Sequence, residues 1–569
     1  MIFVKKAPAH PILHVILLLV TLSLTCSELL RAETIGRTWQ VYEIELTAGE
    51  SRDNPYREIE AHAGDDLLTA VFTGTEGEAE GRSMKVTGFW DGDDRWKIRF
   101  APPVPGSWTY RTKSADAGLD GREGTFRVTG WSDEELADNP TRRGLLQVSN
   151  SGPRTGRHFA YYDGTPMLWV GDTWWNWTKR SIHFSSFRNL VDDRAGKGFN
   201  IGQLFVAGNG WGREASLLDE TWTSLDMELM QRVDRMVEYA NENGMTVWVH
   251  AWWSRDNIAE TIGEENMRRW WRYLVHRLGA YNVIWVLAGE YNMNNYGGFD
   301  LSFWDELGTM IRREDPWDRI ISTHPTPPGW SGGADAPQWS TGEVLHDRNW
   351  LDYNQSQPGH GRWRLEMTPS IIAADYRREP AKPTLVTEPW YEFIEGNPSG
   401  REVRIGAWSS ILSGAAGHTY GGGHIWLAHL PESPAGGGPW PLEESFDVNT
   451  LDYPGARSMS YMAGFFEDVE WWKMHPAPEL VHDYREPYCL ANEGEEYVVY
   501  LRWGGPATID LSSADEKKRF AYRWFNPATG EFYSEGEVSG GGIRTISPVE
   551  DYPGRVEFRD WVLHIQKIR

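Results

Sequence analysis

Two stretches, VIWVLAGEYN (residues 283–292) and KPTLVTEPWYE (residues 382–392), decide the fold of this chain of 569 residues. In each stretch a short apolar run rich in β-forming residues stops at a glutamate, Glu290 or Glu388, and polar and aromatic residues follow. In a barrel of parallel strands, the carboxyl ends of all the strands lie on one rim. The two glutamates are therefore expected to meet at such a rim, although they are far apart in the sequence.

The central region, residues 140–474, alternates between short apolar runs and amphipathic helical patterns such as residues 225–244. Eight strands alternating with helices predict an α/β fold, a (β/α)₈ TIM barrel with insertions. The fifth and sixth strands are the weakest signals. The eight runs are PMLWVGD (166–172), NIGQLFVA (200–207), MTVWVHAWW (245–253), NVIWVLAGE (282–290), RIISTHP (319–325), LDYNQS (351–356), PTLVTE (383–388) and GHTYGG (417–422).

The regions on either side of the barrel show strand patterns instead. Residues 33–135 contain alternating apolar and polar runs broken by Gly, Pro and Asp clusters, which predicts an N-terminal β-sandwich. Residues 478–569 return to this pattern and predict a C-terminal β-sandwich.

The first 32 residues are typical of an export signal. Lys5 and Lys6 precede an apolar run from Ile12 to Leu24, and a small-residue cleavage site lies near Ala32. A membrane anchor is the alternative, but the run is short for a span of ~20 residues. We therefore expect an exported protein, periplasmic or extracellular, with no stable membrane span after cleavage. Lipidation of Cys26 stays open, and a mature chain with Cys489 alone forms no internal disulfide.

Composition narrows the partners. A formal net charge of −25 disfavours nucleic acids and anionic membrane surfaces, because it repels phosphates. It also disfavours strongly acidic polysaccharides unless the binding cleft is locally basic. The 32 tryptophans are an enrichment, and part of them fills cores. Those that follow strand ends can stack on the C–H faces of sugar rings, so we expect a carbohydrate substrate.

Two carboxylates at one rim suit glycosidic bond cleavage, which needs a proton donor and a carboxylate that attacks the sugar or activates water. We therefore predict Glu290 and Glu388 as the catalytic pair of a glycoside hydrolase. The alternative for each glutamate alone is a solvated or ion-paired rim charge. Glu392 lies four residues after Glu388 and competes for the second role, but it follows the break at Pro389 and is expected in a loop.

Other rim residues are candidates for binding the sugar. For Asp172 the alternative is a helix cap or a strand-end turn, and for Tyr391 it is packing in the wall. Trp253 follows Trp252 after the third strand. The candidates are Asp172, Trp174, Trp175, His250, Trp252, Asn292, His324, Trp390, Tyr391 and Tyr420. His418 and His424 lack metal-ligand spacing, so neither a metal nor another cofactor is expected.

The motifs GDTWWN (171–176), LAGEYN (287–292) and TEPWYE (387–392) resemble the apiosidase-like glycoside hydrolase family, a group of retaining clan A barrels. The resemblance implies that Glu290 is the general acid/base and Glu388 the nucleophile. It extends to the N-terminal sandwich and to a C-terminal module named for collagen binding. Gly289 departs from the pattern, because many clan members carry there an Asn that contacts the sugar 2-hydroxyl. Asn292 and Asn209 are candidates to replace that contact.

Two other functions stay open as alternatives. A barrel without activity would be a carbohydrate- or matrix-binding protein. A peptide or ester hydrolase is less consistent with the chain, which lacks a G-x-S-x-G run. Neither the sugar and its linkage, nor endo or exo action, nor the oligomeric state follows from these residues.

Overall fold

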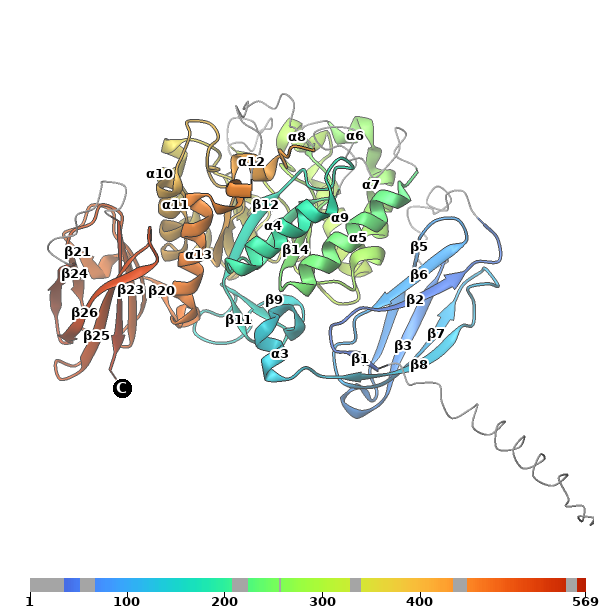
Figure 1. Ribbon diagram of the computed structural model, residues 1–569, viewed down its shortest axis with the longest axis horizontal. Coiled ribbons are helices and arrows are strands. Elements are labelled where there is room, and N and C mark those ends of the chain that lie inside the picture. The colour runs from blue at the N-terminus through green and yellow to red at the C-terminus, as the bar shows by residue number, and fades with distance from the viewer. Residues whose placement is uncertain are drawn as a thin grey trace, which may run out of the picture.

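The computed structural model describes residues 35–51, 67–206, 224–254, 257–327, 339–432, 448–548 and 560–568. Three bodies follow one another, an N-terminal β-sandwich, a central barrel and a C-terminal β-sandwich (Figure 1). The predicted signal peptide, residues 1–32, and Asn209 lie outside the described residues.

The barrel confirms the predicted fold class. Its eight parallel strands are hydrogen-bonded in the order β16-β15-β14-β13-β12-β19-β18-β17, and each lies on one of the eight predicted runs. The circle closes where Asp352 N donates to Ile321 O at 2.9 Å and Ser322 Oγ donates to Tyr353 O at 2.8 Å. The strands are β12 (Trp169–Trp174), β13 (Ile201–Phe205), β14 (Thr246–His250), β15 (Val283–Val286), β16 (Ile321–Ser322), β17 (Asn354–Ser356), β18 (Thr384–Val386) and β19 (Gly417–Tyr420).

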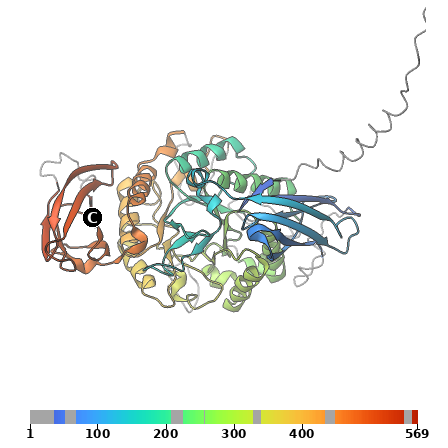
Figure 2. The same cartoon turned by 90° about the horizontal axis from the view of Figure 1, so that it is seen from below.

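Helices surround these strands, as the view from below shows (Figure 2). Asp226 caps helix α5 (Met227–Glu242) by accepting from Leu229 N. Ser399 forms a capping box with Glu402 at the start of helix α11 (Gly400–Leu412). The long helices are α4 (Phe184–Gly196), α5 (Met227–Glu242), α7 (Gly263–Leu278), α9 (Leu301–Glu314), α10 (Arg362–Tyr376), α11 (Gly400–Leu412) and α13 (Pro454–Glu467). The short ones are α3 (Asp133–Asp138), α6 (Ile258–Thr261), α8 (Met293–Gly297) and α12 (Gly423–Trp426). Between β16 and β17 the described residues hold only a 3₁₀ turn, Thr341–Glu343.

Both sides of each barrel strand are buried, because one side faces the interior and the other faces the helices. On β12, Trp169 packs in the interior cluster, whereas Val170 and Trp174 join the helix-facing core. The following Trp175 points inward again. This alternation with a period of two decides which rim residues can reach the interior.

The N-terminal sandwich docks on the barrel through buried charges. Arg99 donates to Asp234 on α5 at 2.7 Å, and Arg277 on α7 donates to both Asp234 (2.7 Å) and Asp91 (2.8 Å). The two sheets of the N-terminal sandwich have the strand orders β1-β8-β7-β3-β4 and β2-β6-β5. The strands are β1 (Ile35–Arg37), β2 (Tyr42–Thr47), β3 (Thr69–Glu76), β4 (Ser83–Thr87), β5 (Phe89–Trp90), β6 (Arg95–Phe100), β7 (Gly106–Lys113) and β8 (Glu123–Thr129).

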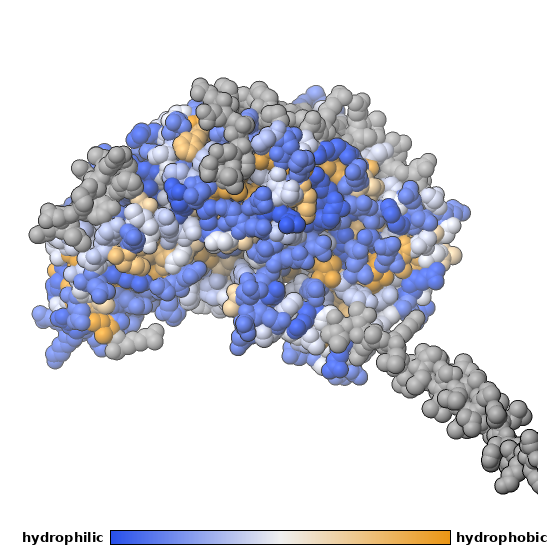
Figure 3. Space-filling model, viewed as in Figure 1, coloured by the Kyte–Doolittle hydropathy of each residue, from blue (hydrophilic) through white to orange (hydrophobic). Residues whose placement is uncertain are grey.

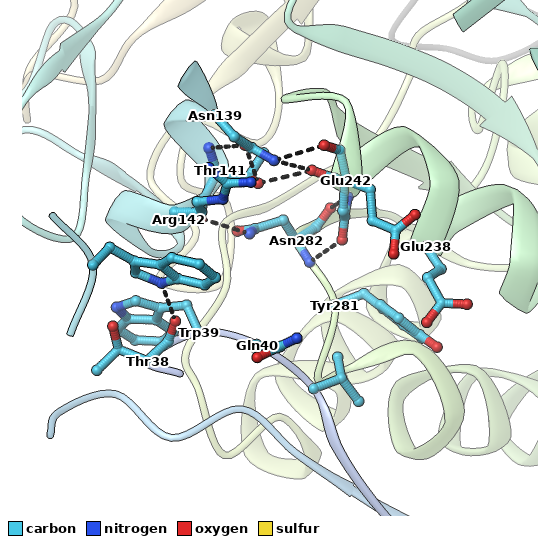
Figure 4. A pocket seen from close by; sticks show the side chains of 13 residues that line it. Thr38, Trp39, Gln40, Asn139, Thr141, Arg142, Glu238, Glu242, Tyr281 and Asn282 are labelled. Carbon is cyan, nitrogen blue, oxygen red and sulfur yellow. Dashed lines mark hydrogen bonds between the residues drawn. The ribbon is translucent and has the colours of Figure 1, made fainter. Parts of the chain in front are cut away.

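A pocket of about 370 Å³ lies where this sandwich, the linker and the barrel meet (Figure 4). Asn139 on the linker donates to the carbonyls of Asn241 and Glu242 at 2.9 Å, and Asn282 donates to Thr141 O at 3.0 Å. These polar groups bond one another, so they tie the linker to the foot of α5. A small sheet of β9 (Leu146–Val148), β10 (Phe159–Tyr161) and β11 (Pro166–Met167) covers the same end of the barrel (Figure 1).

The C-terminal sandwich packs on α11 and α13. Trp408 of α11 lies 6.0 Å from Tyr500, and Arg404 forms a buried ion pair with Asp560 at 2.9 Å. Its sheets have the orders β20-β22-β23-β28-β25-β26 and β21-β24-β27. The strands are β20 (His475–Pro476), β21 (Val481–His482), β22 (Tyr488–Asn492), β23 (Glu496–Leu501), β24 (Ala507–Asp510), β25 (Arg519–Asn526), β26 (Glu531–Ser539), β27 (Ile543–Ile546) and β28 (Trp561–Lys567).

The molecular face in Figure 3 is mostly hydrophilic, with small scattered apolar patches. In the part of the chain that the structure describes, no helix has the length and apolar character needed to cross a membrane.

Candidate active site

Glu290 and Glu388 follow the ends of β15 and β18, on the same rim of the barrel. Both are nearly buried, with 7% and 6% of their surface exposed. A buried carboxylate needs hydrogen-bond donors, because removing its charge from water is costly. The two glutamates meet this need in different ways.

Two histidines hold Glu388. His324 Nε2 lies 2.9 Å from one carboxylate oxygen, and His360 Nε2 lies 3.5 Å from the other. Thr387 Oγ1, at 3.1 Å from His324 Nδ1, orients that ring. Burial alone would raise the pKa of the Glu388 carboxyl, but the hydrogen bonds and charge attraction of the two histidines outweigh it and hold the pKa at about 2. Glu388 is therefore ionised over the ordinary pH range.

Among the described residues, two neutral donors contact Glu290. Trp253 Nε1 donates to Oε2 at 2.7 Å, and Gln357 Nε2 donates to Oε1 at 3.2 Å. The backbone of Glu290 is left-handed, with φ of 49°. That conformation costs a non-glycine residue about 1–2 kcal/mol, and such strain is common where a side chain must point in one direction.

Two neighbouring rings link the two carboxylates, because each ring is hydrogen-bonded to one of them. Trp253, which binds Glu290, has its ring 6.4 Å from that of His324, which binds Glu388. Tyr391 lies within electrostatic range of both glutamates. Burial raises the pKa of its hydroxyl well above the ordinary value, and the charges of Glu388 and Glu290 raise it further. Its hydroxyl accepts a hydrogen bond from Trp175 Nε1 at 3.1 Å. The structure thus brings the predicted pair together around shared aromatic residues.

The His250 ring packs against Trp175 and Trp248, whose ring centroids are 5.2 and 5.5 Å from its own. It is fully buried, and neither ring nitrogen has a hydrogen-bond partner among the described residues. Burial, together with the charge of His324, lowers the pKa of His250 well below its ordinary value. The ring is therefore neutral.

The same packing explains Gly289. A Cβ atom at this position would lie 2.3 Å from His250 Cε1 and 2.6 Å from Trp253 Cε3. No side chain fits without moving both rings. The Asn that many clan members carry before the acid/base residue is thus excluded here by the two rings that face the site.

Four predicted sugar-binding residues face the helices and not the interior. Asp172 accepts from Arg194 Nε on α4 at 2.6 Å and from Trp174 Nε1 at 3.0 Å. Trp174 packs on Phe187, and Trp252 packs on Trp270 of α7. Tyr420 donates to Glu392 at 2.8 Å. The structure does not bring Asp172, Trp174, Trp252 and Tyr420 together with Glu290 and Glu388.

Asn292 and Trp390 follow the ends of β15 and β18, as the two glutamates do. Asn292 Oδ1 accepts from Thr326 N at 2.8 Å and so fixes the segment after β16. Trp390 belongs to the interior cluster and donates to Glu395 O at 2.7 Å. Trp175, His250, His324 and Tyr391 contact one another, and His324 contacts Glu388. Whether each of them contacts a sugar stays a prediction.

Glu392 is separate from Glu388. It is fully buried and accepts hydrogen bonds from Tyr420 Oη at 2.8 Å and from Gly455 N at 2.9 Å. Burial raises the pKa of Glu392 to about 7, despite the nearby charge of Arg194. Its contacts lie on the helix side of the barrel, which does not favour a role as the nucleophile.

Two residues in direct contact with the pair were missed. Gln357 and His360 follow β17 in the segment QPGHGR (357–362), after the less secure sixth strand. The signal that points to them is their position directly after the sixth run, LDYNQS (351–356), at the same rim as the two glutamates. Of the adjacent Trp252 and Trp253, the sequence predicts Trp252 as the sugar-binding residue. In the structure Trp253 contacts Glu290. Within the described residues, no group of three or more His, Cys, Asp or Glu side chains is placed to hold a metal ion.

Each of the three regions of the chain matches a known protein family. The family described as "Apiosidase-like, catalytic domain" matches residues 153–473, more than half of the chain and all eight barrel strands. The chain belongs to the apiosidase-like family. Residues 36–115 match a domain of unknown function (DUF5060), and residues 476–566 match the family described as "Putative collagen-binding domain of a collagenase". No match is found among curated proteins.

Solved structures share the fold of this apiosidase-like chain. A glycoside hydrolase family 5 protein from Bacteroides vulgatus ATCC 8482 is 21% identical, with a TM-score of 0.64 over 75% of this chain and 95% of that one. A second protein from that organism, described as "a putative glycoside hydrolase", is 16% identical, with a TM-score of 0.67 over 94% of this chain and 100% of its own. At these identities the likeness concerns the fold alone.

Proposed function

We propose that this apiosidase-like protein is an exported, retaining glycoside hydrolase that cleaves a polysaccharide or oligosaccharide, with Glu388 as the nucleophile and Glu290 as the general acid/base. The observation that carries the proposal is the difference between the two carboxylates. Glu388 is held ionised by His324 and His360, whereas Glu290 is bound by the neutral donors Trp253 and Gln357.

The first step uses this difference. The ionised carboxylate of Glu388 attacks the anomeric carbon, and the bond to the leaving oxygen breaks as protonated Glu290 donates its proton to that oxygen. The glycosyl-enzyme ester forms on Glu388. His324 and His360 stabilise the carboxylate before the attack and after its release.

In the second step Glu290, now a carboxylate, takes a proton from water as that water attacks the anomeric carbon. The ester bond to Glu388 breaks, and the sugar leaves with its anomeric configuration retained. Trp175 and Tyr391 are buried and hydrogen-bonded to each other in the interior cluster next to Glu388.

Export rests on the sequence of residues 1–32 alone. A fusion of these residues to a reporter enzyme in a bacterial host would place the reporter outside the cytoplasm, and a reporter that stays inside would contradict export.

The mechanism is tested by Glu388→Gln and Glu290→Gln. Both side chains keep their size, so we expect unchanged folding. Turnover should fall about 10⁴-fold or more for Glu388→Gln and about 10²- to 10⁴-fold for Glu290→Gln. The assay is release of reducing ends from a panel of polysaccharides and of aryl alcohol from aryl glycosides.

The same assay separates the alternatives. Near wild-type turnover in either variant would contradict the assignment of that residue. A wild-type protein that binds glycans but releases no reducing ends from any member of the panel would instead support a non-catalytic binding protein. A product with inverted anomeric configuration would contradict the retaining mechanism.

A further inference from the structure

Tryptophan is buried almost throughout this protein, with two exceptions. Among the tryptophans of the described residues, only Trp363 and Trp503 are exposed, with 55% and 47% of their surface in contact with solvent. Leaving a large aromatic side chain in water forgoes the free energy of burying it. An exposed tryptophan therefore marks a surface that contacts something else.

Trp363 lies close to the catalytic pair. It is in the first turn of α10, three residues after His360, whose Nε2 is 3.5 Å from Glu388. Three residues of extended chain span at most ~11 Å. Trp339 packs edge-on against Trp363 at 5.9 Å and supports the exposed indole from the side. Trp363 therefore lies at the edge of the site, beside the histidine that contacts the nucleophile.

Trp503 belongs to the C-terminal sandwich but lies near the same end of α10. The preceding Arg502 forms an ion pair with Glu366, which is three residues after Trp363 and hence on the same face of the helix. An interdomain ion pair thus separates the two tryptophans. In Figure 1, α10 and α11 lie on the side of the barrel that faces this sandwich.

Arginines accompany both indoles. The Arg364 guanidinium is 4.9 Å from the Trp363 ring, and that of Arg401 is 5.6 Å from the Trp503 ring. An aromatic ring beside guanidinium donors suits a sugar unit, whose C–H face stacks on the ring while its oxygens accept from the arginine.

We propose that Trp363 and Trp503, with Arg364 and Arg401, form a glycan-binding surface shared by the barrel and the C-terminal sandwich, which holds the part of a polysaccharide chain that extends beyond the catalytic glutamates. The occupant is a saccharide chain because the surface begins beside His360 at the site itself. This inference rests on the proposed glycosidase function. It assigns the C-terminal sandwich a part in substrate binding.

The binding test uses native affinity gels that contain galactomannan, xyloglucan or polygalacturonate. The protein carries Glu388→Gln so that the gel polymer stays intact. We expect retardation in at least one gel and about 2- to 10-fold weaker binding after Trp363→Ala or Trp503→Ala, with a larger loss in the double variant. The neutral and acidic polymers distinguish stacking from charge attraction to the arginines.

Tyr162→Ala is the matched control. This aromatic residue is also exposed, at 42%, but it packs on Trp39 near the pocket of Figure 4, at the opposite end of the barrel. Its removal should leave retardation unchanged. The proposal is overturned if no gel retards the parent protein, or if Tyr162→Ala weakens binding as much as the tryptophan variants. Retention on immobilised collagen that depends on Trp503, without retention in any polysaccharide gel, would also overturn it.

Activity with Glu388 intact provides a second readout. The ratio of kcat/KM on the retarding polymer to kcat/KM on an aryl glycoside should fall about 2- to 10-fold in each tryptophan variant, because only the polymer reaches the surface. An unchanged ratio overturns the proposal. If Glu388→Gln retains turnover, the catalytic assignment fails, and the gels still decide the binding surface separately.

Discussion

The inner and outer sides of the barrel rim hold similar residue types in opposite roles. On the inner side, Glu388 is bound by two histidines and its pKa is held at about 2. On the outer side, four residues further along the chain, Glu392 is bound by Tyr420 and a backbone N–H, and burial raises its pKa to about 7. The comparison teaches that the direction of the side chain, not the residue type, decides which carboxylate can do chemistry.

The largest expected effect on the outer side comes from Asp172→Ala. The change leaves Arg194 buried without its main partner, so the free energy of unfolding should fall by about 3–5 kcal/mol. Chemical denaturation measures this loss. Glu123→Ala, at an exposed ion pair with Arg111, is the control and should cost less than about 1 kcal/mol. A small loss of stability with a raised KM would instead favour Asp172 as a sugar ligand.

On the inner side, His324→Phe removes the closest donor to Glu388. Burial then raises the pKa of Glu388, so its carboxylate is protonated as the pH falls through a higher range than in the wild type. We expect about a 100-fold loss of kcat/KM at pH 5 and an acid limb that moves to higher pH. His418→Phe is the control, because His418 is buried against α11 on the outer side. An unmoved acid limb in His324→Phe would contradict the role given to the histidine.

Gly289→Ala tests the packing of the inner rings. The added Cβ meets His250 and Trp253, and the free energy of unfolding should fall by about 1–3 kcal/mol. Gly464→Ala on α13 meets no atom within 4 Å and should be neutral or slightly stabilising. Equal thermal shifts for the two variants would show that the rings yield easily to a side chain.

The smallest effect is the pH dependence contributed by Glu392. In the folded protein this carboxyl keeps its proton up to about pH 7, whereas in the unfolded chain it loses the proton near its ordinary pKa of 4.5. Stability from Glu392 is thus full below about pH 4.5 and is lost as the pH rises to 7, by about 2 kcal/mol between pH 5 and 7. Glu392→Gln should remove this slope in unfolding curves measured across that range.

Glu388 has the opposite sign and provides the control. Its folded pKa lies below 4.5, so its contribution is lost as the pH falls from about 4.5 to 2. Glu388→Gln should remove the slope in that acid range and lower the free energy of unfolding above about pH 4.5, where the ionised carboxylate contributes in the wild type. An unchanged acid slope in Glu388→Gln, or an unchanged slope between pH 5 and 7 in Glu392→Gln, would contradict the contrast between the two sides.

The barrel could be predicted from sequence because buried parallel strands form continuous apolar runs. Each of the eight runs overlaps an observed strand, and Glu290 and Glu388 follow the carboxyl ends of two of these strands. The direction of the neighbouring side chains could not be predicted. Both sides of each strand are buried, so no polar alternation separates inward Trp175 from outward Trp174. Side chains alternate along a strand, so Thr173 and Gly171 share the inner side with Trp175, and Asp172 lies on the outer side.

The contacts of the pair were less accessible to sequence reasoning. Gln357 and His360 come from the loop after β17, a strand of three residues that offers a weak signal. Their contacts depend on how that loop turns back over the rim, which no local pattern states. Gly289, by contrast, departs from the clan pattern in the sequence itself. The packing of His250 and Trp253 in the structure explains why a glycine stands there.

The left-handed backbone of Glu290 has a consequence for the descent of such proteins. Glycine adopts this conformation without strain, and a single nucleotide change converts a glutamate codon to a glycine codon. Loss of the acid/base side chain would therefore relax the chain locally instead of straining it. A barrel that only holds glycans would gain backbone freedom from glycine at this position, and the cost would be the lost acceptor of Trp253 and Gln357.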